Sequence, residues 1–481
     1  MGGLLTLDSF IRTFPSLDTI TTTGAQQEYN AKIQGTVIGL YNIGGIFGSL
    51  LCIYFGDRLG RRSVIAIASL VAMAGAILMA TSFQLAQLIV ARLILGLGTG
   101  GYLATVPVWQ SELSRATKRG ASLVFNTAYI GSGISLALFL DLGVYFVGDN
   151  SVSWRFPFAF QVVLLAMVAF FVSVLPESPR WLVKKGRRDE AREILSILLG
   201  TEPGSPAVRL DIQEMENSLA ISASGARWGV FKMGKQRTMH RTLLASAGQF
   251  FQQLCGINAI TLYTTTLFEG FLGLGPVQAR VLSACIGLAD IAGGVVAYYT
   301  IERLGRRILM MSSSAMLCIC MAILAGTTSD PTNDSALITA VVFVYMFEGV
   351  FSVGFSGLPY LYAAEVAPLE HRAATNAIST ATVWAFAFMV AEVTPVGLNG
   401  IKNRYFIIYA ALNAAITLLV YFCFPETKGR TLEEIDEIFV QSKNIFDPPR
   451  IARILPRLES SHVLSDLKLD TNEEQLPEAH K

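Results

Sequence analysis

Long apolar stretches separated by short polar segments run through most of the chain. Each stretch is long enough to cross about 30 Å of hydrocarbon as a helix. The polar segment 176–241 separates five stretches from six, and its pattern is typical of short amphipathic helices at a membrane surface. We therefore predict an all-α membrane protein with helix bundles at 34–175 and 242–424. The predicted spans are 34–55, 64–83, 86–107, 121–147, 155–175, 242–268, 279–300, 308–327, 336–362, 374–396 and 404–424.

Short motifs occur once in each predicted bundle. The sequence GDRLGRR at Gly56–Arg62 returns as IERLGRR at Ile301–Arg307, where each copy closes an apolar stretch. A parallel repeat of this size is typical of membrane transporters. The other matching pairs, at offsets of roughly 245 to 253 residues, are Glu112 with Glu365, Arg119 with Arg372, Pro176 with Pro425 and Glu177 with Glu426.

Composition supports a membrane protein and excludes several other classes. The 481 residues are 52% apolar and 15% charged, and the mean hydropathy is +0.49, which is too hydrophobic for an ordinary soluble domain. Six scattered cysteines and four dispersed histidines form no disulfide or metal pattern. The net charge of +1 argues against a nucleic-acid partner. We expect no cofactor, no metal and no enzymatic activity.

The distribution of basic residues predicts the orientation, because cytoplasmic loops collect Lys and Arg. Basic clusters at 58–62, 115–119 and 303–307 fall on one side, together with the segment 176–241 and the tail 425–481. We assign that side to the cytoplasm.

Residues 1–33 then lie outside the cell, although they contain neither a signal-peptide core nor a spanning run. The simplest interpretation is that a first helix is missing. Asn333, in a loop on the same outer side, begins a three-residue glycosylation pattern, which is weak evidence by itself.

With these motifs placed, the chain resembles the sugar porter branch of the major facilitator superfamily, and is most similar to fungal hexose and polyol carriers. The resemblance extends from Gly2 to about Phe439 and implies twelve helices in two halves, with the substrate held between them. Its motifs are GDRLGRR, ELSRATKRG at Glu112–Gly120, PESPRWL at Pro176–Leu182, QQLCGIN at Gln252–Asn258, ERLGRR and PETKGRTLEEI at Pro425–Ile435.

The resemblance also gives Arg92 a role. In the family, the first helix ends with a proton-coupling aspartate, and Arg92 matches the arginine that pairs with it. An unpartnered guanidinium inside a span would cost several kcal/mol. Arg92 therefore favours an incomplete chain over a natural protein with eleven spans.

Three amides are the main candidates for binding a sugar. An amide supplies both a donor and an acceptor, as sugar hydroxyls require, and the resemblance assigns this role to Gln252, Gln253 and Asn258. Gln252 and Asn258 would point about 240° apart on an unbroken helix, so we expect the helix to loosen near Gly256. The alternative is that these amides only join helices.

Further candidates come from aromatic and acidic positions. Trp384 matches a family tryptophan, and Tyr360 stands where many relatives have tryptophan; core packing is the alternative for both. Thr127 replaces a common glutamine. Asp290, central in its span, replaces a common asparagine and could carry a proton or select an unusual ligand. For Glu348 and Glu392 we favour a neutral acid bonded to a neighbouring helix.

The cytoplasmic motifs indicate gating. Ion pairs there could hold the inner ends of the bundles together and release them when the halves rock. The alternative is a set of solvated charges. The candidates are Asp57, Arg61, Glu112, Arg119 and Glu177 in the first half, and Glu302, Arg306, Glu365, Arg372 and Glu426 in the second.

The sequence therefore predicts transport of a monosaccharide or polyol by alternating access. We expect a monomer in the lipid bilayer of the plasma membrane, with a proton as a possible partner. A sugar sensor that does not transport and an inactive truncated porter are the alternatives.

Overall fold

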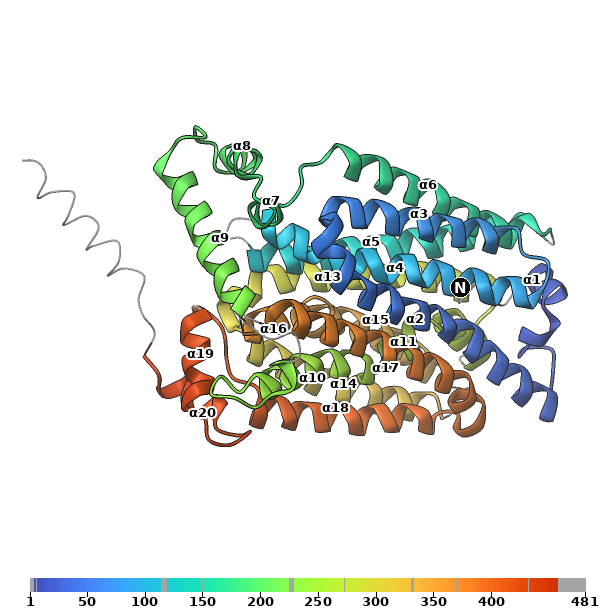
Figure 1. Cartoon of the computed structure of the whole chain (residues 1–481). Helices are drawn as coiled ribbons and strands as arrows, with labels where there is room; N and C mark the ends of the chain where they lie inside the picture. Colours follow the sequence, from blue (N-terminus) through green and yellow to red (C-terminus); the bar gives the residue numbers. More distant parts are fainter. Residues whose placement is uncertain are drawn as a thin grey trace, which may run out of the picture.

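The computed structural model shows a chain of helices, and its described part contains no strand (Figure 1). It describes residues 4–456 except for residues 6, 114–118, 149, 225–228, 272, 330–332, 369–370 and 431. Ten helices in this described part are long and apolar enough to cross a membrane. The prediction of an all-α membrane protein is confirmed.

The first half contains five long helices behind a short N-terminal segment. That segment forms α1 (Asp8–Thr13) and a 3-10 turn (Pro15–Leu17), and its Phe10 and Phe14 rings lie 5.7 and 5.5 Å from the Trp154 ring. The first long helix begins earlier than the predicted residue 34. The five helices are α2 (Ala25–Leu59), α3 (Arg61–Ala80), α4 (Leu85–Leu113), α5 (Arg119–Tyr145) and α6 (Val152–Val174).

The second half differs from the first because two of its spans are broken. The predicted span 242–268 is divided into α10 (Thr238–Leu254), α11 (Ile257–Thr261), α12 (Thr264–Thr266) and the π-helical turn η4 (Leu267–Phe271). The predicted span 336–362 is divided into α15 (Asp334–Phe351), the π-helical turn η5 (Ser352–Ser356) and α16 (Leu358–Val366). The unbroken helices are α13 (Pro276–Leu304), α14 (Arg306–Thr327), α17 (Arg372–Ile401) and α18 (Arg404–Cys423).

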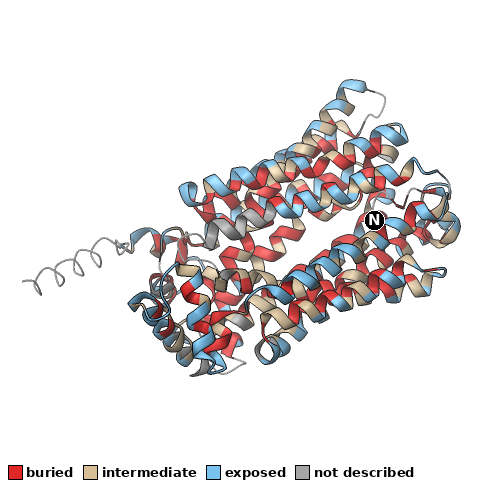
Figure 2. Cartoon of the chain, turned by 90° about the horizontal axis from the view of Figure 1, so that it is seen from above, coloured by how far each residue is buried: buried red, intermediate tan, exposed pale blue. Residues whose placement is uncertain are grey.

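The two halves meet along a seam, which we define as the contacts of α2 with α17 and of α5 with α13. Glycines allow close approach there: a Cβ added to Gly45 would lie 2.6 Å from the Trp384 ring, and one added to Gly287 would lie 2.4 Å from the Ser135 hydroxyl. Figure 2 shows buried residues on the inward sides of the helices and exposed residues on their outer sides. The long helices therefore pack through small residues, as is usual in membranes.

The short helices of the linker between the halves and of the tail lie at one end of the bundles (Figure 1). Three of them, α7 (Pro179–Lys184), α8 (Arg188–Leu199) and α9 (Pro206–Ser224), share a small apolar core around Trp181 and Leu195. A short turn at Gly229–Phe231 follows α9, and α19 (Leu432–Gln441) and α20 (Pro448–Ile454) form the described part of the tail.

The repeated motifs form the same turn in both halves. Gly60 joins α2 to α3 with φ 91° and ψ 167°, and Gly305 joins α13 to α14 with φ 96° and ψ 166°. Such positive φ values favour glycine. A Cβ would lie 2.4 Å from Glu177 Oε2 at Gly60 and 2.6 Å from Glu426 Oε2 at Gly305. Each turn therefore requires glycine both for its conformation and for the carboxylate packed against it.

We predict that Gly305→Ala lowers the stability of the folded protein by about 1–3 kcal/mol, because alanine is strained at this φ and its methyl group would displace Glu426. The midpoint of thermal unfolding in detergent can be followed with a thiol-reactive dye, since Cys255 and Cys320 are fully buried. Gly326→Ala is the matched control, because it lies in α14 with no atom within 4 Å of an added Cβ. Equal midpoints for the two variants would contradict the assigned role of Gly305.

Candidate functional site

The break at Gly256 places two of the predicted amides against each other. Gly256 has φ 102°, and an added Cβ would lie 2.7 Å from Met321 and 3.0 Å from the Tyr409 ring. Across this break the Asn258 side chain donates from Nδ2 to Gln253 Oε1 at 2.7 Å. The pair uses one polar atom of each amide. The Gln253 amino group and the Asn258 carbonyl oxygen are the remaining donor and acceptor.

Gln252 points to a different neighbour. Its Nε2 donates to the backbone carbonyls of Phe355 at 2.8 Å and Ser356 at 3.0 Å, both in η5. These carbonyls belong to the π-helical turn, where the regular helical hydrogen bonding changes. The contacts of Gln252 match the alternative in which an amide joins two helices, so its predicted role in sugar binding remains a prediction.

Trp384 lies on the seam between the halves. The indole ring covers Gly45 of α2, and its centroid lies 5.9 Å from the Tyr41 ring in an edge-on arrangement. Trp384 is 8% exposed, and its Nε1 has no hydrogen-bond partner among the described residues. An aromatic face with a buried donor at this position is suited to a ring with hydroxyl groups.

Arg92 extends the same group of side chains into the first half. Its Nη2 donates to the Ile38 carbonyl at 2.9 Å, and its guanidinium lies 5.6 Å from the centre of the Tyr41 ring. Arg92, Tyr41 and Trp384 therefore form a continuous chain of contacts from α4 through α2 to α17. The predicted pairing of Arg92 with an aspartate of a preceding helix stays a prediction.

The acidic candidates are buried in the second half and on the seam. Asp290 is 4% exposed in the middle of α13, and Glu348 is 3% exposed on α15. Glu348 Oε1 accepts from the Thr261 hydroxyl at 2.7 Å, and Glu392 Oε1 accepts from the Thr36 hydroxyl at 2.8 Å. Both have the neighbouring-helix bond that we expected for them.

In the first half, the residues of the repeated motifs make two kinds of contact. The Arg61 guanidinium pairs with Glu112 at 3.1 Å and donates to the Gly56 carbonyl at 3.0 Å. Glu177 accepts instead from the backbone N–H groups of Arg61 at 3.0 Å and of Arg62 at 3.2 Å. Glu177 therefore caps the start of α3, where the helix has unpaired N–H groups.

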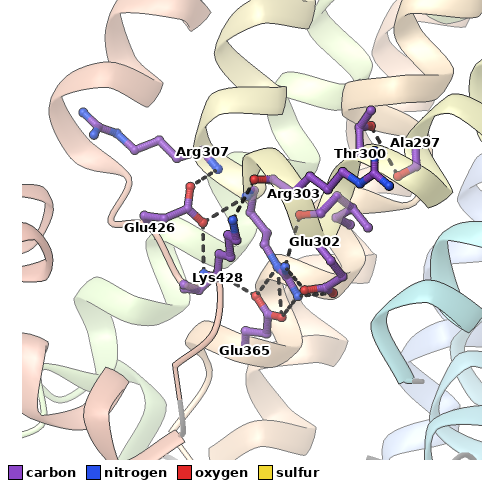
Figure 3. A network of polar contacts seen from close by, with 11 residues as sticks. Ala297, Thr300, Glu302, Arg303, Arg307, Glu365, Glu426 and Lys428 are labelled. Carbon is purple, nitrogen blue, oxygen red and sulfur yellow. Dashed lines mark hydrogen bonds and ion pairs between the residues drawn. The ribbon is translucent and has the colours of Figure 1, made fainter. Parts of the chain in front are cut away.

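The second half repeats this arrangement, and Figure 3 shows Glu302 and Glu365 close together, with Glu426 on the side of Arg307 and Lys428. The Arg306 guanidinium pairs with Glu365 at 2.8 Å and with Glu302 at 3.0 Å. Glu426 accepts from the backbone N–H groups of Arg306 at 2.9 Å and of Arg307 at 3.1 Å. Each of these contacts joins two residues of the same half. The predicted gating by ion pairs between the halves therefore stays a prediction.

The remaining candidates are placed by their helices. Tyr360 is half-buried on α16, one turn after η5, and Arg372 begins α17. The side chains of Asp57, Arg119 and Thr127 lie outside the described residues.

The sequence did not identify Tyr41 and Thr36 as seam residues. Both lie on α2, which also carries Gly44, Gly45 and Gly48. Gly44 and Gly48 pack against the backbone of α4, whereas Gly45 packs against Trp384. This spacing of small residues is the signal that could have marked α2 as a helix packed on two sides.

The comparisons with known proteins agree with this architecture. A family model described as "Sugar (and other) transporter" matches residues 1–439. The MFS-type transporter oryC of Aspergillus oryzae is 35% identical over 438 residues, covering 89% of this chain and 81% of that protein. The sugar transporter STL1 of Saccharomyces cerevisiae is 30% identical over 470 residues, covering 96% and 82%.

A solved structure shows the same fold. The proton:xylose symporter XylE, bound to 6-bromo-6-deoxy-D-glucose, superimposes with a TM-score of 0.77 at 23% identity, covering 91% of this chain and 97% of that one. The family model covers the motif turns, the broken helices and both sides of the seam. This chain belongs to the sugar porter family of the major facilitator superfamily.

Proposed function

We propose that the protein moves a monosaccharide or a polyol across the membrane by alternating access. The observation that carries this proposal is the Gln253–Asn258 pair at the break between α10 and α11, which both pack against α17, the helix that carries Trp384. The relatives named as a sugar transporter and as a proton:xylose symporter support the substrate class.

The amide pair can replace hydrogen bonds that a sugar loses when it leaves water. A sugar loses its hydrogen bonds to water when it leaves solution, and each unreplaced bond costs about 1–3 kcal/mol. The Gln253 amino group can donate to a hydroxyl, and the Asn258 carbonyl can accept from one. Because the two amides are already bonded to each other, less side-chain entropy is lost when the sugar binds.

The seam provides the surface on which the halves move. Along α2 and α17 the Trp384 and Phe388 rings pack onto Gly45 and Gly39, and along α5 and α13 the backbones approach closely at Gly131 and Gly287. Within each half, Arg61–Glu112 and Arg306–Glu365 tie the cytoplasmic ends of the helices together. Halves that are tied internally and meet at glycine contacts are suited to rocking about a central site.

The proposal also includes the oligomeric state, the membrane and the remaining motif residues. We propose that the protein works as a monomer in the plasma membrane. We further propose that Arg119 and Arg372 join the motif contacts of their halves during the transport cycle, because Glu112 and Glu365 carry their motifs in the equivalent places.

We predict that Asn258→Ala reduces the rate of sugar uptake about tenfold or more, because one hydroxyl then loses its partner and Gln253 loses its own. Uptake of radiolabelled glucose, fructose, arabinose and sorbitol into yeast lacking endogenous hexose carriers measures this, normalised to surface expression. Gln441→Ala is the control, since that amide is exposed on α19 and bonds only to Glu437 among its described contacts. Normal uptake by a well-expressed Asn258→Ala variant would contradict the proposal.

We predict that Trp384→Ala raises the KM for uptake about tenfold, because the aromatic ring at the seam is lost. Trp384→Phe keeps a ring and should raise KM only about twofold, which isolates the contribution of the indole N–H. Initial rates across a range of sugar concentrations give both values. A lowered maximal rate with unchanged KM in Trp384→Ala would instead assign Trp384 to the movement of the halves.

A further inference from the structure

Asp290 is a buried carboxyl whose surroundings leave one oxygen without a bond. It lies in the middle of α13, is 4% exposed, and its Oδ1 has no hydrogen-bond partner among the described residues. The Ser352 hydroxyl from η5 donates to the Asp290 backbone carbonyl at 2.7 Å. An ionised carboxylate is strongly disfavoured in such a place, so the group either binds something or stays neutral.

The Asp290 side chain lies at the seam. A Cβ added to Gly131 of α5 would lie 3.0 Å from Asp290 Oδ2 and 3.1 Å from the Gly287 carbonyl. The first half therefore covers this carboxyl directly with backbone. Any change in the charge of Asp290 acts on the surface along which α5 and α13 would slide.

Glu348 is the acidic neighbour of Asp290. The two lie within electrostatic range of each other, and α13 and α15 cross beside them, where a Cβ on Gly293 would lie 2.2 Å from the Gly349 carbonyl. Glu348 Oε1 accepts from Thr261 on α11, the same short helix that carries Asn258. This carboxyl is therefore one hydrogen bond away from the helix of the sugar site.

The other ionisable groups around this pair are few. Cys255, at the end of α10, lies within electrostatic range of Glu348. In the facing part of α5 stand Gly131 and Ser135, and η5 contributes Ser352.

The nearest described cation along α13 is Arg280, about 15 Å from Asp290 at 1.5 Å per residue. Arg280 contacts Glu269 at 3.6 Å and the Tyr145 ring at 4.1 Å, and it acts electrostatically on Asp141. Among the described residues, no Lys, Arg or His pairs with Asp290 or Glu348.

We propose that Asp290 and Glu348 form a proton-binding site that couples proton movement to sugar movement, an inference that rests on the proposed transport function. Two carboxyls buried where α13 and α15 cross, with no Lys, Arg or His paired to either among the described residues, cannot both stay charged, so they hold at least one proton between them. A second proton neutralises the pair. The proton enters from the water on one side of the membrane and leaves to the water on the other side. The only bond that forms and breaks is the O–H bond of the carboxyl group.

A proton on these carboxyls would affect both the seam and the short helix α11. Neutral Asp290 allows Gly131 to move past it without exposing a charge to backbone carbonyls. Neutral Glu348 can donate as well as accept, which changes its bond to Thr261 and so affects α11. A proton would therefore favour the rearrangement of the seam together with that of the sugar site.

Purified protein in liposomes tests this inference. An inward proton gradient of about one pH unit should give about tenfold accumulation of sugar if one proton accompanies each sugar. D-xylose and D-glucose are the probes, and a pH-sensitive dye inside the vesicles records proton entry. We expect Asp290→Asn to abolish both accumulation and proton movement while retaining exchange of labelled for unlabelled sugar at equal pH. Glu348→Gln should behave in the same way.

Controls separate the possible failures. Glu28→Gln, an exposed carboxyl on α2, should keep gradient-driven accumulation. If the intact chain neither exchanges nor accumulates any sugar, the proposed function fails. If it exchanges sugar and Asp290→Asn and Glu348→Gln both keep accumulation, only the proton site is refuted. Accumulation that follows a sodium gradient instead would refute the proton as the ion. Loss of exchange in both variants would show that the two acids are structural.

Discussion

The absence of water from the membrane interior is the constraint on which the rest of this structure depends, because every polar group there must find a partner within the protein. Regular helices satisfy this by themselves. The second half departs from regular helices at two places, and at each place a side chain donates a hydrogen bond to the backbone carbonyls there. Asn413 donates to the Cys255 carbonyl at 2.9 Å beside the Gly256 break, and Gln252 donates to the η5 carbonyls. These side chains let two spans break where the sugar site is proposed.

The two halves share one turn but differ in the polar residues that they place inside the bundle. Gly60 and Gly305 form nearly identical turns, each held by a glutamate that caps the following helix. In each half, this turn holds together the helices at the same end of the bundle. The broken helices and the Asp290–Glu348 pair, in contrast, lie in the second half, while the first half contributes Arg92 and the glycine face of α2. Two halves with the same turns thus contribute different residues to the proposed site.

The seam explains why side chains distant in the sequence act together. Trp384 lies over Gly45, Glu392 bonds to Thr36, and Asp290 lies under Gly131. In each case a side chain of the second half meets the backbone or a small residue of the first. A larger residue at Gly45 or Gly131 would separate the helices, so close contact and a movable surface come from the same glycines.

The sequence by itself determined the helical membrane class, the repeat, the family resemblance and the expected loosening near Gly256. The length of an apolar stretch and the position of a glycine are local properties of the chain, so they can be read without the fold. It did not predict η5, the position of Tyr41, or the separation of Gln252 from Gln253 and Asn258. Those features depend on which carbonyls a distant side chain can reach, and α10 meets η5, α16 and α17 only in the folded bundle. The tertiary structure therefore decided which polar residues stabilise the breaks and which remain available for a ligand.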